Sequence, residues 1–253
     1  MLIAVKIGNS TTNFAFFENP ADTNFDLISF ETKKMVDWQK ELQKLSFKEA
    51  DCIISSVVPS VTKIVFSFFK RRCKNLFLVD SKSFTGLTLK LKKPHKFGSD
   101  RLCSAVAAYE LYRKNVAVID AGTATTITVV TKDAEVVGGA IMPGVNSMNE
   151  ALSEKTANLH IVELKGEILA LGKDTDSAIK SGVVLGSVFA IEGLVKAMQK
   201  ELGVKLSVVL TGGHAELISK YMRMRHSLNK YLVIEGMRLI YLKNIKKGGC
   251  HEN

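Results

Sequence analysis

The sequence predicts an α/β fold of two similar lobes, and two observations support this prediction. Short strands rich in β-branched residues alternate with amphipathic helical patterns along the 253 residues. The same succession of a strand, a glycine turn and two further strands also begins twice, at Leu2 and at Val116. We therefore expect two α/β lobes, residues 1–114 and 115–253, with a cleft between their hairpin turns.

The first lobe opens with a predicted β-hairpin. Leu2–Ile7 is an alternating, β-branched segment, and the pattern breaks at Gly8-Asn9-Ser10 and resumes at Thr12–Phe17. Hydrophobic periodicity then predicts a strand, a helix, a strand, a helix and a strand. These segments are 25–31, 36–45, 52–56, 61–72 and 76–79. A helix that begins near Asp100 ends the lobe.

The second lobe repeats this opening. The three predicted strands are 116–120, 125–131 and 135–141. Helical patterns follow at 145–153 and 175–202, then an apolar strand at 206–210 and helices around 215–222 and 234–243.

The composition is that of an ordinary soluble domain. Hydrophobic residues make up 46% and charged residues 24% of the chain. No apolar run approaches the roughly 20 residues that span a bilayer. The apolar run at residues 1–5 meets Lys6 too early to form a signal-peptide core. We expect a cytoplasmic protein with no membrane partner.

Cysteine and histidine spacing excludes the common structural metal sites. The four cysteines form no CxxC pair, and the five histidines form no HExxH motif. We therefore expect neither a structural zinc site nor a disulfide. The net charge of +10 favours anionic ligands, but the lysines are spread over the chain without an aromatic-interleaved basic motif, so we expect no nucleic-acid partner.

Two glycine turns are followed by hydroxyl side chains, at 8–12 (Gly-Asn-Ser-Thr-Thr) and 122–126 (Gly-Thr-Ala-Thr-Thr). Glycine lets a phosphate approach the backbone, and Ser and Thr hydroxyls add hydrogen-bond donors without adding charge. Each turn alone is also what an ordinary hairpin requires. Their equivalent places in the two halves favour phosphate binding.

Three further positions suit the same chemistry. Asp120 precedes the second turn at a strand end, where a carboxylate can hold a metal ion beside phosphates or bond its own turn. Gly212 and Gly213 follow a strand and precede a helix, which would let a nucleotide lie against glycine backbone, although many strand-to-helix turns look alike.

Asp100 lies within Phe97-Gly98-Ser99-Asp100-Arg101, at the start of a predicted helix. A carboxylate within hydrogen-bond reach of an alcohol can accept its proton during attack on a γ-phosphate, and a neighbouring arginine can bind a substrate carboxylate. The alternative role of Asp100 is that of an N-cap for the helix that follows.

In order and spacing along nearly its whole length, the sequence resembles the type III pantothenate kinases. The matching segments are GNS at 8–10, SSVVP at 55–59, FGSDR at 97–101, DAGTATT at 120–126, GGAIMPG at 138–144, TA at 156–157, GKDT at 172–175 with SG at 181–182, TGGHA at 211–215 and IEGMRL at 234–239. The resemblance implies two ribonuclease-H-like lobes of the actin-like ATPase architecture, with a cleft between the lobes.

The resemblance also implies an activity and a site. The activity is ATP-dependent phosphorylation of pantothenate to 4′-phosphopantothenate, the first step of coenzyme A biosynthesis, by a homodimer that needs Mg2+ and a monovalent cation such as K+ or NH4+. Asp100 would be the catalytic base and Asp120 would hold the metal. Gly98, Ser99, Arg101 and, from the partner subunit, Thr175 would bind pantothenate. The residues implied for ATP are Lys6, Gly8, Asn9, Ser10, Thr11, Gly122, Thr123, Thr125, Gly212 and Gly213.

Three positions depart from the family's pattern. Lys6 stands where the family has an aspartate, Thr128 where it usually has a second aspartate, and Leu91 where many members have an aromatic residue. Exchange of a carboxylate for an ammonium reverses the local charge by two units, each worth about 1–4 kcal/mol at close range in a wet site, and is expected to weaken activity. The sequence thus leaves two alternatives to an active pantothenate kinase. One is a catalytically degenerate regulatory or accessory protein, and the other is a different kinase of the same superfamily.

Overall fold

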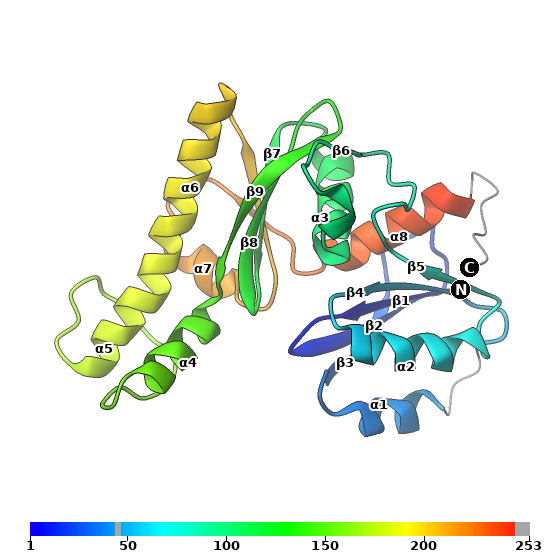
Figure 1. Cartoon of the computed structure of the whole chain (residues 1–253), viewed down its shortest axis with the longest axis horizontal. Coiled ribbons are helices and arrows are strands. Elements are labelled where there is room, and N and C mark those ends of the chain that lie inside the picture. Colours follow the sequence, from blue (N-terminus) through cyan, green and yellow to red (C-terminus); the bar gives the residue numbers. More distant parts are fainter. Residues whose placement is uncertain (44–46, 246–253) are drawn as a thin grey trace. The chain divides into compact units, whose positions relative to one another are not determined.

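The structure is a computed structural model that describes residues 1–43 and 47–245. The chain divides into two compact units, each with its own sheet (Figure 1). Unit 1 is Met1–Leu111 together with the helix α8 (Leu232–Ile245), and unit 2 is Tyr112–Tyr231. The expected boundary after residue 114 lies close to this division, but α8, expected in the second lobe, belongs to unit 1.

Unit 1 contains a five-stranded sheet in the order β3-β2-β1-β4-β5. Its strands are β1 (Leu2–Ile7), β2 (Thr11–Phe17), β3 (Asp26–Glu31), β4 (Asp51–Ser56) and β5 (Asn75–Leu78). The central strand β1 runs antiparallel to β2 and parallel to β4. The expected hairpin is confirmed, with Ile7 opposite Thr12 across the first glycine turn, Gly8–Thr11.

Helices cover both faces of this sheet (Figure 1). One face packs under α1 (Met35–Leu42) and α2 (Pro59–Lys70) around an aromatic core that includes Phe14, Trp38 and Phe69. The other face carries α3 (Ser99–Tyr112) and α8, and the red α8 lies beside the blue β1 although more than 200 residues separate them in sequence.

A glycine allows α8 to pack closely on α3. A Cβ atom at Gly236 would lie 1.8 Å from the carbonyl oxygen of Cys103, far inside van der Waals contact. Both Cys103 and Gly236 are buried. The glycine of the IEGMRL segment is therefore required by helix packing, one turn from the residues that begin α3.

Unit 2 contains five strands in the order β11-β10-β7-β8-β9. They are β7 (Val116–Ala121), β8 (Ala124–Val130), β9 (Glu135–Pro143), β10 (Ser207–Thr211) and β11 (Ser227–Leu228). Its helices are α4 (Val145–Lys155), α5 (Thr175–Lys180), α6 (Gly186–Leu202) and α7 (Ala215–Tyr221), with the π-helical η2 (Ser181–Leu185) joining α5 to α6.

Contrary to the expectation from the sequence, one continuous helical segment, Thr175–Leu202, is long and apolar enough to cross a membrane by length and composition. Half of its most apolar window is buried inside the protein. Val183, Val188 and Ile191 of this segment belong to the hydrophobic core of unit 2. The core helix of a soluble protein passes the same hydropathy test, and the packing of these three residues in the core of unit 2 agrees with that role.

Most elements predicted from the sequence are confirmed within two or three residues. The predicted end of α1 at residue 45 lies outside the described residues. The sequence did not predict β6 (Thr88–Leu89), the 3-10 helix η1 (Pro94–Lys96) or β11. These elements have two or three residues each, too few to show a hydrophobic period.

Candidate active site

Asp100 lies in the first turn of α3, which begins at Ser99. Its Oδ1 accepts a hydrogen bond of 2.7 Å from the backbone N–H of Arg101, and the side chain is half-buried. The alternative N-cap position, just ahead of the helix, is therefore not where Asp100 lies. Gly98 leaves room beside the carboxylate, because a Cβ atom at this position would lie 2.7 Å from Asp100 Oδ1.

The hydroxyl of Ser99 joins the start of α3 to the end of β4. It donates a hydrogen bond to the carbonyl of Ser56 and accepts hydrogen bonds from the N–H of Ser56 and the hydroxyl of Ser55, each 3.0 Å long. A serine hydroxyl has one hydrogen to donate and two lone pairs, so these three bonds use its full capacity. The predicted contact between Ser99 and substrate stays a prediction, whereas the observed bonds position the turn that carries Asp100.

The guanidinium of Arg101 lies over the ring of Phe97, with its carbon 4.7 Å from the ring centroid. Burial lowers the pKa of Arg101, and the neighbouring Asp100 carboxylate partly opposes this effect. A planar guanidinium held against an aromatic ring can bind a carboxylate through two parallel hydrogen bonds. Arg101 is therefore suited to an acidic ligand next to Asp100.

Lys6 and Asp100 lie near the same buried thiol. Burial raises the pKa of Cys103 from its ordinary value of 9.0 to about 12, the Ser55 hydroxyl and the Lys6 ammonium lower it, and the Asp100 carboxylate raises it. The fold of unit 1 thus brings the ammonium of β1 and the carboxylate of α3 into one neighbourhood. Neither spacing nor composition indicated this relationship.

The first glycine turn is held by Thr32, the residue that follows β3. The Thr32 hydroxyl donates a hydrogen bond of 2.7 Å to the Gly8 carbonyl, and the Thr32 N–H donates one of 2.9 Å to the Ser10 carbonyl. Thr12 and Thr32 share a further buried hydroxyl–hydroxyl bond of 3.0 Å. Asn9, Ser10 and Thr11 remain exposed on the fixed turn.

Unit 2 brings Asp120, the second glycine turn (Gly122–Thr125) and Gly212 together. Asp120 is half-buried at the end of β7, and a Cβ atom at Gly212 would lie 2.4 Å from its Oδ1. Gly212 has φ = +97°, in the left-handed region that favours glycine. Thr123 is exposed, whereas the side chain of Thr125 is buried, with 1% of its surface exposed. Gly213 is exposed, with no atom near its missing side chain.

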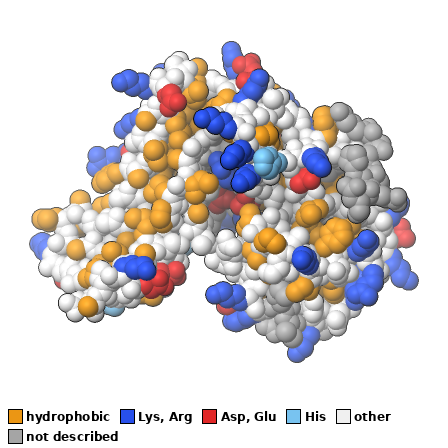
Figure 2. Space-filling view, viewed as in Figure 1, with side chains coloured by type: hydrophobic (Ala, Val, Ile, Leu, Met, Phe, Trp, Pro, Cys, Tyr) orange, Lys and Arg blue, Asp and Glu red, His pale blue; other side chains and the backbone are white. Residues whose placement is uncertain are grey.

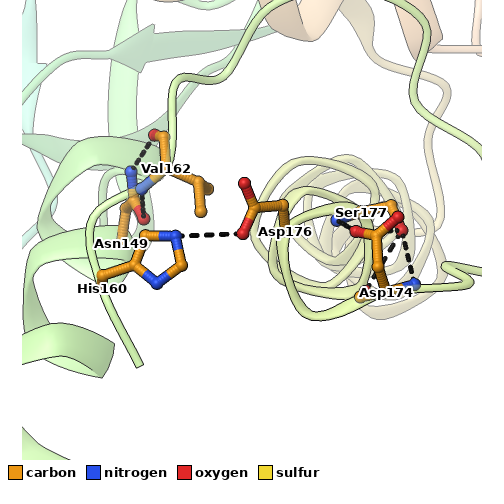
Figure 3. Close-up of polar contacts among 6 residues, drawn as sticks. All are labelled: Asn149, His160, Val162, Asp174, Asp176 and Ser177. Atoms are coloured by element: carbon orange, nitrogen blue, oxygen red, sulfur yellow. Dashed lines mark hydrogen bonds and ion pairs between the residues drawn. The ribbon is translucent and has the colours of Figure 1, made fainter. Parts of the chain in front are cut away.

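Thr175 lies elsewhere in unit 2, on an apolar groove of about 700 Å³ between α4 and α5. Asp174 caps α5 by accepting the Ser177 N–H at 2.8 Å (Figure 3). The loop before α5 is tied to the helices in the same view. The Asn149 side chain donates a hydrogen bond to the Val162 carbonyl and accepts one from the Val162 N–H. His160 Nε2 lies 3.0 Å from Asp176 Oδ1.

Each unit therefore gathers its own part of the predicted site. In unit 1, Lys6, Ser99, Asp100 and Arg101 lie around the ends of β1 and β4, and in unit 2, Asp120, Gly122 and Gly212 lie around the end of β7. Asn13, Ser55 and Cys103 were missed by sequence reasoning as members of the first group. For Asn13 and Ser55 the available signal was strand register, since both lie directly opposite Lys6 on the neighbouring strands.

Comparison with known proteins agrees with the resemblance in sequence. The family model described as type III pantothenate kinase matches residues 2–197. A curated relative, "Type III pantothenate kinase" of Persephonella marina, is 35% identical over 250 residues, which cover 95% of this chain and 98% of the relative.

Two solved structures share the fold at low sequence identity. A conserved Campylobacter jejuni protein described under the Baf family is 18% identical with a TM-score of 0.65, covering 96% of this chain and 99% of that chain. The ethanolamine utilization protein EutJ of Carboxydothermus hydrogenoformans is 13% identical with a TM-score of 0.54, covering 94% and 89%. These likenesses show a two-lobed, actin-like α/β fold. The family match and the full-length relative together show that this chain belongs to the type III pantothenate kinase family.

Proposed function

We propose that this protein transfers the γ-phosphate of ATP to the primary hydroxyl of pantothenate and so begins coenzyme A synthesis in the cytoplasm. The observation that carries the proposal is the Asp100 carboxylate at the start of α3, between Gly98 and the ring-supported Arg101, in a chain of this family. A half-buried carboxylate beside a guanidinium suits a substrate that carries both an alcohol and a carboxylate.

Asp100 acts as general base in this proposal. It accepts the proton of the alcohol while the alcohol oxygen forms a bond to the γ-phosphorus. The bond between that phosphorus and the β–γ bridging oxygen breaks, and ADP leaves with the electron pair. Arg101 binds the carboxylate of pantothenate and orients the hydroxyl towards Asp100, with Gly98 beside it. Ser99 contributes by positioning this turn.

The glycine turns bind the phosphates of ATP in this proposal. The first turn would act through Lys6, Gly8, Asn9, Ser10 and Thr11. The second would act through Gly122, Thr123 and Thr125, with Gly212 and Gly213 against the nucleotide. Backbone N–H groups of such turns point towards anions, which is the basis of this assignment.

A divalent cation fits this site as a companion of ATP. Among the residues that the structure describes, no three His, Cys, Asp or Glu side chains gather to form a metal cage. Mg2+ is commonly bound by one or two carboxylates together with substrate phosphates, and the carboxylate of Asp120, beside which Gly212 leaves room, meets that description. Bound there, Mg2+ would neutralise phosphate charge. The requirement for K+ or NH4+ stays a prediction of the family resemblance.

A coupled assay of ADP release tests the proposed function. With Mg2+ and K+ present, the wild type should release ADP only when pantothenate is added. Asp100→Asn should lower kcat roughly 10²–10⁴-fold, because the amide oxygen can still accept the Arg101 N–H while the proton acceptor is lost. Asp133→Asn, on an exposed turn, is the matched control and should leave kcat unchanged.

Two results would contradict the proposal. Binding of ATP without any pantothenate-dependent turnover would favour a degenerate regulatory or accessory protein. Turnover with another alcohol but not with pantothenate, in a panel of hydroxyl substrates, would favour a different kinase of the same superfamily.

We also propose that the protein is a homodimer in which unit 2 supplies the interface. The groove beside Thr175 is lined by apolar side chains, among them Met148, Leu152 and Val183. Nearby segments expose further large hydrophobic residues, with Leu171 78% and Phe189 55% exposed. Figure 2 shows hydrophobic side chains gathered along the α5 and α6 region of unit 2. Surfaces of this kind are typical of protein–protein contacts.

Light scattering after size-exclusion chromatography tests the homodimer. Phe189→Glu and Leu171→Glu should shift the wild-type dimer to monomer, because each places a charge in a surface that would otherwise be buried. Leu111→Glu, at a 55% exposed position of unit 1, should leave the mass unchanged. A monomeric wild type, or dimers that persist in both unit 2 variants, would refute this interface.

A further inference from the structure

Lys6 occupies a defined row on the sheet of unit 1. Across β2, β1 and β4, Asn13, Lys6 and Ser55 lie directly opposite one another. Ile3, Val5 and Ile7 belong to the aromatic core under α1 and α2, so alternation along the strand places Lys6 on the opposite face. The effect of Lys6 on the pKa of Cys103 agrees with a position towards α3.

The Lys6 ammonium forms no ion pair within residues 1–43 and 47–245, although the Asp100 carboxylate lies in the same neighbourhood. The ammonium is half-buried and forms no side-chain hydrogen bond with any of these residues. Opposite it on β2, the Oδ1 atom of Asn13 is buried and accepts no hydrogen bond within the same described part of the chain. A partly buried ammonium that pairs with no carboxylate is available to an anionic ligand, and the unpaired Asn13 oxygen beside it shows that the row is not closed by contacts within the described residues.

The ammonium lies two residues before the first glycine turn. That turn is fixed from beneath by Thr32, as described above, and presents the exposed residues Asn9, Ser10 and Thr11. A cation at the end of a strand next to a rigid glycine turn can bind phosphate oxygens together with the turn's backbone.

Unit 2 has the opposite charge at the equivalent position. Asp120 lies two residues before Gly122, as Lys6 lies two residues before Gly8, and each is on the first strand of a hairpin. A carboxylate can bind a phosphate only through a cation between them, whereas an ammonium binds it directly. The two turns are therefore built for two different ways of binding phosphate.

We propose that Lys6 and the first glycine turn form a phosphate subsite that needs no divalent cation and binds the terminal phosphate of a polyphosphate chain. This inference rests on the proposed function, since it assigns the subsite to ATP. In this proposal the two units bind phosphate in different ways. Lys6 of unit 1 binds a phosphate directly, and Asp120 of unit 2 acts through the divalent cation that accompanies the nucleotide.

Titration calorimetry with inorganic tripolyphosphate in EDTA tests the subsite without turnover. Wild type should bind, and Lys6→Met and Lys6→Gln should bind roughly 10- to 100-fold more weakly, the effect of losing one charge-assisted contact. Lys63→Met, at an exposed position of α2, should bind as the wild type does. Unchanged thermal unfolding of each variant shows that the fold is retained.

Lys6→Asp provides a second readout. This variant should lose tripolyphosphate binding in EDTA and regain it when excess Mg2+ is added, because a carboxylate needs the cation to contact phosphate. Equal affinity of wild type and Lys6→Met, or absence of wild-type binding in EDTA, would overturn the subsite. Pantothenate-dependent ADP release by wild type, measured separately, would then still support the proposed function. Conversely, Lys6-dependent binding without turnover would retain the subsite and reject the function.

Discussion

The hydroxyl of Ser55 at the end of β4 donates a 3.0 Å hydrogen bond to the hydroxyl of Ser99, 44 residues later at the start of α3. Both side chains are buried. The bond couples the central sheet of unit 1 to the helical turn that carries Asp100, so the position of the proposed base depends on a sheet residue that does not itself react.

Ser99→Ala should therefore lower kcat while changing the KM for pantothenate less, because the base moves and the rest of the site remains. It should also cost about 1–3 kcal/mol of unfolding free energy, since the Ser56 N–H loses its acceptor. In a double-mutant cycle with Ser55→Ala, the coupling should be about 0.5–3 kcal/mol. Urea unfolding and steady-state kinetics measure both effects.

Ser67→Ala, at an exposed position of α2, is the matched control for this cycle. If Ser99→Ala lost stability but kept the wild-type kcat, the Ser55–Ser99 pair would serve folding alone.

Gly236→Ala should destabilise unit 1 by about 1–3 kcal/mol or more, because its Cβ would lie 1.8 Å from the Cys103 carbonyl and would force α8 away from α3. Gly193→Ala supplies the comparison. It lies in α6 with no atom within 4 Å of the added Cβ, and should stabilise by up to about 1 kcal/mol through helix propensity. Thermal unfolding of the two variants should thus shift in opposite directions, and equal shifts would argue against tight α3–α8 packing.

The buried thiol of Cys103 should make the protein sensitive to alkali. Its pKa is raised from 9.0 to about 12, mainly by burial, so between these values the unfolded thiol ionises while the folded thiol keeps its proton. The unfolded state then binds fewer protons, and the free energy of unfolding falls as pH rises, by up to about 1.4 kcal/mol per pH unit. Below pH 9 this stabilisation is fully present.

Cys103→Ala isolates this effect from the titration of lysines and tyrosines. Urea unfolding between pH 8 and 11 should show a steeper loss of stability above about pH 9 in wild type than in the variant. Parallel curves would mean that the Cys103 thiol ionises alike in both states.

Gly212→Ala should impair nucleotide binding through Asp120. The backbone at 212 is in the left-handed region, and an added Cβ would meet Asp120 Oδ1 at 2.4 Å and the Ala121 carbonyl at 2.7 Å. The strain should cost about 1–3 kcal/mol of stability, and the displaced carboxylate should raise the Mg2+ concentration needed for half-maximal ATP binding.

Gly213→Ala is the neighbouring control, since nothing lies within 4 Å of its added Cβ. Calorimetry of ATP binding across a Mg2+ series should separate the two variants. If the Gly212→Ala variant needed the same Mg2+ concentration for ATP binding as the wild type, Asp120 would not be a ligand of the metal.

Local patterns in the sequence predicted the elements well, for physical reasons. The period of two in β1 and β2 and the glycines at 8 and 122 determine hairpins without tertiary information. The long apolar helix from Thr175 to Leu202 was likewise visible from its period, although the π-helical turn at 181–185 was not, since it changes only one turn of the pattern.

Relationships across the fold could not be predicted in this way. The sequence placed Asp100 near a helix start, but only the parallel pairing of β1 with β4 brings Lys6 opposite Ser55 and hence near the Asp100 turn. The prediction from sequence placed α8 in the second lobe because this helix follows that lobe in the chain. The glycine at 236 lacks a side chain and so permits close contact with α3, which becomes evident only once both helices are placed.

The return of α8 to unit 1 has a consequence for biosynthesis. Unit 2 is one continuous stretch, 112–231, and can fold as soon as it leaves the ribosome. Most of unit 1 is translated before unit 2, yet one face of its sheet is covered by α8 only after residues beyond 231 have been made. The nascent chain should therefore complete unit 2 first, and α3, the helix that bears the proposed base, should reach its mature support only after α8 has left the ribosome.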